Sequence, residues 1–119
     1  RGCYTSHADQ KRFNRRCEDL LYQAELFATL AMLTAETAYP KTEIEEAWKK
    51  VLFNQFHDIL PGSAIPEVYV DANQDWREAE QTATAILNQS LQELSPYRQT
   101  NQRLTDFTLK SKEWNTVCP

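Results

Sequence analysis

The sequence predicts an all-α fold, an antiparallel three-helix bundle with a partly irregular C-terminal tail. Apolar residues recur at steps of three and four in three long stretches, which is the mark of helices with one buried face. Short segments containing proline or glycine separate the stretches, and short connections make neighbouring helices antiparallel. Only 2 of the 119 residues are glycine, which is low for a β fold with many turns.

The first helix is expected to begin near His7, with Thr5 or Ser6 as its N-cap, and to run to about Thr37. Tyr39-Pro40 ends the pattern, because proline disfavours helix in the residue before it. The predicted buried face consists of Phe13, Cys17, Leu20, Leu21, Ala24, Phe27, Ala28 and Ala31.

The second helix is expected to begin at Thr42, because Thr42 and Glu45 have the spacing of a capping box. Pro61-Gly62 is the predicted stop, which places His57 and Asp58 in the last turn of this helix. Its predicted apolar side consists of Ile44, Ala47, Trp48, Val51, Leu52 and Ile59.

Pro66 suits the first turn of a third helix, which is expected to end at Ser95-Pro96. Its apolar residues are Val68, Ala72, Trp76, Ala79, Ala83, Ile86, Leu87, Leu91 and Leu94. Residues 98–109 are compatible with a further helical stretch, whereas residues 110–119 show no period. The sequence therefore predicts a domain over residues 1–95, with residues 96–119 as an extension of the bundle or a linker.

Composition excludes several classes of partner. A net charge of −4 argues against nucleic acid and anionic membranes, which both bind basic surfaces. No apolar run is long enough for a membrane span. Cys3, Cys17 and Cys118 are odd in number and lack the spacing of a metal site, which favours a reducing, cytoplasmic setting.

Phe53, Phe56 and His57 point away from the apolar side of the second helix on a helical wheel. Two aromatic residues and a histidine there indicate a surface that something else covers. The alternative is a helix buried on both sides within its own fold, with His57 as a hydrogen-bonded core residue. His57 and Asp58 alone make no zinc site, because zinc takes three or four protein ligands, and no complete catalytic constellation is visible.

Three blocks of the sequence point to a known family. Residues 52–63 contain a Gln-Phe-His-Asp run, then two apolar residues, a variable position, glycine and serine. Residues 2–6 (Gly-Cys-Tyr-Thr-Ser) with the pattern from Lys11 to Glu25 form a second block, and residues 68–72 form a third. In this order, over residues 1–95, the blocks resemble the middle helical domain of the family-38 glycoside hydrolases, the zinc-dependent α-mannosidases.

The resemblance implies a three-helix bundle between an N-terminal catalytic domain and C-terminal β-domains of one polypeptide, with residues 96–119 leading towards the latter. Such enzymes are retaining hydrolases of terminal α-mannosides, with an aspartate nucleophile and a second carboxylate as acid/base. By motif position, His57 corresponds to a zinc ligand that the helical domain donates, and Asp58 to a residue that contacts the sugar. The nucleophile, the acid/base and the other ligands are expected on the catalytic domain, so the isolated chain should be inactive and should hold zinc weakly at best.

A second hypothesis is a self-contained helical adaptor that binds a partner protein through the Phe53/Phe56/His57 surface. The adaptor predicts a reading frame little longer than these residues. The enzyme domain predicts a frame that continues for several hundred residues on both sides.

Overall fold

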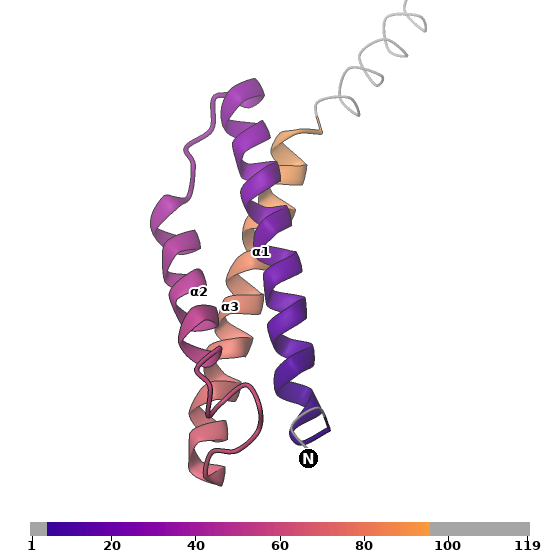
Figure 1. Cartoon of the computed structure of the whole chain (residues 1–119). Coiled ribbons are helices and arrows are strands. Elements are labelled where there is room, and N and C mark those ends of the chain that lie inside the picture. The colour runs from indigo at the N-terminus through magenta and orange to yellow at the C-terminus, as the bar shows by residue number, and fades with distance from the viewer. Residues whose placement is uncertain (1–4, 96–119) are drawn as a thin grey trace, which may run out of the picture.

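The computed structural model describes residues 5–95, and the helices within that range are α1 (Ala8–Ala35), α2 (Lys41–Asn54) and α3 (Pro66–Glu93). α2 runs antiparallel to the other two helices, with residues 36–40 at one end of the bundle and residues 55–65 at the other (Figure 1). The predicted three-helix bundle is confirmed. The predictions for residues 96–119 lie outside the described residues.

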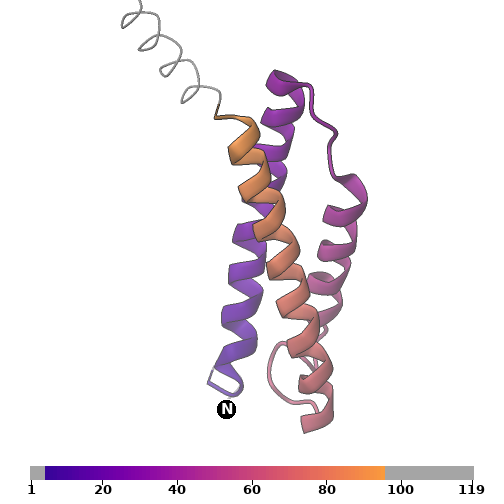
Figure 2. The same cartoon turned by 180° about the vertical axis from the view of Figure 1, so that it is seen from behind.

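α3 is the central helix of the packing and contacts both α1 and α2, as the reverse view shows (Figure 2). Its largest buried side chain is Trp76, which is fully inaccessible. The surrounding residues are mostly small, which allows the helix backbones to approach closely. The buried cluster consists of Cys17, Leu21, Ala24, Ala28, Ile44, Ala47, Val51, Trp76, Ala79, Ala83 and Ile86.

Most of the predicted buried faces are therefore correct, with two clear exceptions. Leu52 and Leu91 are exposed, because each lies one position beyond a residue that takes the inward place, Val51 on α2 and Ser90 on α3. Tyr69 is buried although the apolar pattern did not include it. None of the described helices is long and apolar enough to cross a membrane.

The predicted helix caps are wrong. His7, rather than Thr5 or Ser6, precedes α1, with a left-handed φ of 44° and no capping hydrogen bond from its side chain. α2 begins at Lys41 after Pro40, also without a side-chain cap, so the predicted capping box does not form. Capping is a local pattern, and here the residues that directly precede the two helices, His7 and Pro40, make no capping hydrogen bond through their side chains.

The predicted end of α2 is also wrong, since the helix stops at Asn54 and not at Pro61-Gly62. The Phe56 N–H bonds to the Phe53 carbonyl, three residues back, which tightens the chain out of α-helical geometry. Ile59 then turns inward to a separate small cluster with Tyr69 and Ala72 of α3. His57 and Asp58 consequently lie in the turns of residues 55–65, hereafter the 55–65 segment, and not in a helix.

A buried polar contact fixes the longitudinal position of α1 against α3. Gln10 is fully buried, and its Oε1 accepts a hydrogen bond of 2.7 Å from Trp76 Nε1. Its Nε2 donates to Asn73 Oδ1 at 2.8 Å and to Asp9 Oδ2 at 3.1 Å. Because buried polar groups must be paired, a slip of either helix would leave several of these groups unsatisfied.

Replacing Gln10 with leucine tests this contact. We expect Gln10→Leu to lower the free energy of unfolding by about 1–3 kcal/mol, because the Trp76 indole N–H would be buried without an acceptor. Urea denaturation measures the change. Gln23→Leu, on the exposed side of the same helix, is the matched control and should stay within about 0.5 kcal/mol of wild type. Equal effects of the two substitutions would contradict the role given to Gln10.

Candidate functional site

The 55–65 segment presents His57 and Asp58 to solvent beyond the end of α2. Their side chains are 78% and 58% exposed, and His57 Nε2 lies 3.7 Å from Asp58 Oδ2. The Phe56 and His57 rings are in tilted contact, with centroids 4.2 Å apart. Within residues 5–95, His57 is therefore not a core residue, and neither α1 nor α3 buries it as the alternative interpretation required.

The aromatic side chains next to this pair are exposed as well. Phe53 is 68% exposed and Phe56 is 49% exposed, which agrees with the predicted outward direction of both residues. The helical wheel applies to Phe53, because Phe53 lies on α2. Phe56 lies beyond the helix end, in a turn where its carbonyl accepts hydrogen bonds from the N–H groups of Ile59 and Leu60.

A groove of about 660 Å³ lies between the 55–65 segment and α3. Its walls are largely apolar, but three carboxylates also line it, those of Asp58, Asp71 and Asp75. Within residues 5–95, neither Asp71 nor Asp75 forms an ion pair. The remaining lining residues are Phe53, Asn54, Phe56, Ile59, Ser63, Ala64, Ile65, Val68 and Ala72.

Asn54 closes the helical side of this groove and holds α2 against α3. It is fully buried, and its Nδ2 donates to the Ala72 carbonyl at 3.2 Å. Its Oδ1 has no hydrogen-bond partner among the described residues. This bond joins the last residue of α2 to α3, directly before the 55–65 segment begins.

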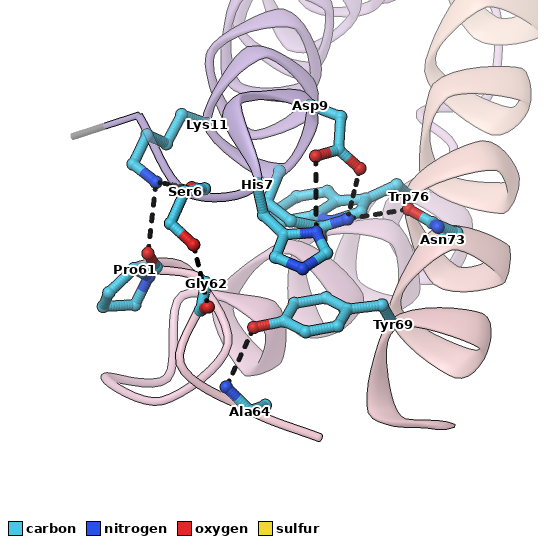
Figure 3. A network of polar contacts seen from close by, with 11 residues as sticks. Ser6, His7, Asp9, Lys11, Pro61, Gly62, Ala64, Tyr69, Asn73 and Trp76 are labelled. Carbon is cyan, nitrogen blue, oxygen red and sulfur yellow. Dashed lines mark hydrogen bonds and ion pairs between the residues drawn. The ribbon is translucent and has the colours of Figure 1, made fainter. Parts of the chain in front are cut away.

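Both ends of the 55–65 segment are tied to the bundle. At its start, Gln55 Nε2 donates to Asn14 Oδ1 at 2.9 Å and to Glu18 Oε1 at 3.0 Å, both on α1. Near its end, the Ala64 N–H donates to the Tyr69 hydroxyl at 2.9 Å, as Figure 3 shows. The exposed pair His57–Asp58 thus belongs to a segment whose two ends are fixed by neighbouring helices.

The start of α1 packs directly against the segment. The Ser6 hydroxyl donates to the Gly62 carbonyl at 3.2 Å (Figure 3). Gly62 has a φ of 87°, in the region that favours glycine. A Cβ at this position would lie 2.8 Å from the Ser6 carbonyl oxygen and 3.0 Å from His7 Cβ.

His7, the other histidine, belongs to this packing and not to the exposed pair. Its ring stacks on Tyr69 with centroids 4.0 Å apart, and its Nδ1 lies 3.7 Å from Asp9 Oδ1. Figure 3 shows the ring lying flat over that of Tyr69. These contacts give His7 a structural role at the start of α1.

The described part of the chain offers one imidazole and one adjacent carboxylate for a metal, and no complete site. Among residues 5–95, no group of three or more His, Cys, Asp or Glu side chains is placed to hold an ion. Burial raises the pKa of the Cys17 thiol to about 11, and the nearby Glu80 carboxylate adds to the effect, so Cys17 stays protonated and is neither nucleophile nor ligand. His57 and Asp58 fit a metal site only if other ligands come from outside this range.

Replacing Gly62 with alanine tests the close approach of α1 to the segment. We expect Gly62→Ala to lower the free energy of unfolding by at least about 1–2 kcal/mol, because an L side chain disfavours this φ and its Cβ would press on Ser6. Urea denaturation measures it, with Ser63→Ala on the exposed neighbouring residue as the control. Unchanged stability of the glycine variant would contradict the described packing.

Comparison with known proteins places the chain among α-mannosidases. A family model described as the alpha mannosidase middle domain matches residues 1–94. The chain is 42% identical over 72 residues to Alpha-mannosidase 2C1 of Mus musculus, covering 60% of this chain and 7% of that protein. It is 35% identical over 95 residues to Alpha-mannosidase G of Dictyostelium discoideum, covering 80% of this chain and 9% of that protein.

A third relative, Alpha-mannosidase of Saccharomyces cerevisiae, is 44% identical over 71 residues, which cover 58% of this chain and 7% of that protein. The chain thus spans less than a tenth of the length of the curated relatives it matches. No solved structure matches it. Because the family model covers most of the chain and the relatives agree with it, the chain belongs to the middle-domain family of the α-mannosidases, glycoside hydrolase family 38.

Proposed function

We propose that this domain donates His57 as a zinc ligand, and Asp58 as a contact to the sugar, to the active site of a retaining α-mannosidase that acts on terminal α-mannosides. One observation supports this above all: the two side chains stand exposed and adjacent on a segment held at both ends. A metal ligand or sugar contact must be held in one geometry, so it is best placed on a segment whose backbone is fixed by its neighbours.

The rest of the active site belongs to another domain of the same polypeptide in this proposal. A catalytic zinc takes three protein ligands or more, and no three His, Cys, Asp or Glu side chains among residues 5–95 are placed to hold one. The nucleophile and the acid/base of a retaining mechanism are likewise carboxylates of the other domain. When bound, zinc would supply a template and Lewis acid for the sugar hydroxyls.

The surface around His57 supports the presence of such a neighbouring domain. Phe53 and Phe56 expose aromatic area beside the proposed ligand, and the groove next to them is largely apolar. Covering this surface would remove apolar area from water and would exclude water from the sugar site. The isolated chain should therefore hydrolyse no mannoside and should bind zinc weakly at best.

The roles of the two residues differ in their chemistry. An imidazole binds a metal through a neutral ring nitrogen, and the exposed ring of His57 is accessible to a metal ion from outside the bundle. An ionised Asp58 carboxylate only accepts hydrogen bonds, so it can bind two hydroxyl groups of a sugar. We also propose a cytoplasmic location, which the free, buried thiol of Cys17 supports.

Removal of the imidazole tests the ligand role. In the full-length enzyme, we expect His57→Ala to lower zinc content per polypeptide and to reduce kcat/KM on an aryl α-mannoside by more than about 100-fold. Loss of a supporting residue around a metal costs about 10–100-fold, so loss of a direct ligand should exceed this range. Gln23→Ala, an exposed change on α1, should behave as wild type. A His57→Ala enzyme with wild-type zinc content would remove the ligand assignment.

A separate substitution tests the sugar contact. We expect Asp58→Asn to keep the zinc content of wild type while lowering kcat/KM by about 10–100-fold, because a hydrogen bond to a charged group is lost. Steady-state kinetics and metal analysis of the same preparations check both parts. Asp19→Asn, at an exposed carboxylate on α1, is the matched control. Zinc loss from the Asp58 variant would show that this residue acts on the metal site instead.

A further inference from the structure

Lys11 joins two segments that are distant in the sequence. It lies in the first turn of α1, and its Nζ donates to the Ser6 carbonyl at 2.6 Å and to the Pro61 carbonyl at 3.3 Å. Figure 3 shows the side chain reaching from the helix to the turn at Pro61. Lys11 forms no ion pair with any described carboxylate, so its ammonium group is directed to these two backbone oxygens.

The position of Pro61 makes this contact relevant to His57 and Asp58. Both side chains are exposed, and the described ring contact of His57 is with Phe56, its own neighbour in the chain. Their direction is therefore set by the backbone of the 55–65 segment and not by packing of the side chains themselves. That segment contains no α-helix or strand, so its conformation depends on contacts to the helices around it.

Contacts between the 55–65 segment and its surroundings lie on both sides of the exposed pair His57–Asp58. Gln55, two residues before His57, is bonded to α1, and Ile59 is buried against α3. After the pair, the segment is bonded by Lys11 at Pro61 and by the Tyr69 hydroxyl at Ala64. Two of these polar contacts involve a charged group, the Glu18 carboxylate before the pair and the Lys11 ammonium after it, and hydrogen bonds to charged groups are stronger than neutral ones.

We propose that Lys11, together with the hydroxyl of Tyr69, is a positioning residue of the active site: it fixes the turn at residues 61–64 and thereby the direction in which His57 and Asp58 are presented to the other domain. The inference rests on the proposed roles of His57 and Asp58. A metal ligand must be held within about 0.5 Å of its productive geometry, so loosening this turn would weaken metal binding without removing a ligand.

The test uses the full-length enzyme with three lysine variants. Lys11→Met removes the ammonium group but keeps an apolar stem, and Lys11→Arg restores donors at the end of a long side chain. Lys49→Met is the matched control, since that lysine is 65% exposed on α2 and pairs with Glu46 of the same helix. The zinc dissociation constant is measured by competition with a chelator, and kcat and KM with an aryl α-mannoside, well below the melting temperature.

We expect Lys11→Met to raise the zinc dissociation constant about 10-fold and to lower kcat about 10-fold. This is the lower end of the effects found for residues that support metal ligands. Lys11→Arg should return both quantities to within about 3-fold of wild type, because its donors can again bond the two carbonyls. Lys49→Met should equal wild type. A purely structural role would instead lower the melting temperature of Lys11→Met and leave the zinc dissociation constant and kcat unchanged, and that result would overturn the proposal.

Tyr69→Phe provides a second test that holds even if Lys11→Met does not fold. It removes only the acceptor of the Ala64 N–H and keeps the ring that stacks on His7. We expect a weaker effect in the same direction, about 3-fold on zinc affinity, and an unchanged affinity would count against the proposal. If His57→Ala loses zinc while Lys11→Met and Tyr69→Phe do not, only the positioning role fails. If His57→Ala keeps zinc and activity, the proposed function fails and this inference with it.

Discussion

The close packing of α1 against α3 around Trp76 is the constraint on which the rest of the structure depends. Small residues on both helices leave room for a single large indole, and removal of this apolar area from water stabilises the pair. Hydrophobic packing alone would allow the helices to slide. The bonds of Gln10 to Trp76 and Asn73 remove that freedom, because they form in one register only.

This register decides which residues meet at the end of the bundle that carries the candidate site. With α1 fixed along α3, the residues at the start of α1 reach the turn that follows α2, and Ser6 and Lys11 bond to its backbone. The same end carries His57, Asp58 and the groove beside α3. The proposed role needs this arrangement, because residues that complete a site on another domain must face outward from a fixed support.

The helices themselves were predictable because their signal is periodic and extends over many residues. The stretch from Cys17 to Ala31 buries most of the predicted positions, with Leu20 and Phe27 only partly buried, and α3 begins at Pro66 as expected. Helix ends were less predictable, since Thr42 and Glu45 have the right spacing for a cap that does not form. The end of α2 at Asn54 had no local signal, and it coincides with tertiary contacts of Asn54 with Ala72 and of Gln55 with α1.

The sequence by itself determined the fold class, the family and the adjacent pair His57–Asp58, because periodicity and motif are properties of neighbouring residues. Tertiary structure decided that this pair lies in a turn and not in a helix, and that Phe53 and Phe56 stay uncovered within the described residues. It also decided that Lys11 bonds to Pro61, 50 positions away. Such contacts join segments without a shared local pattern, so they exist only once the packing of α1 and α3 has set the register.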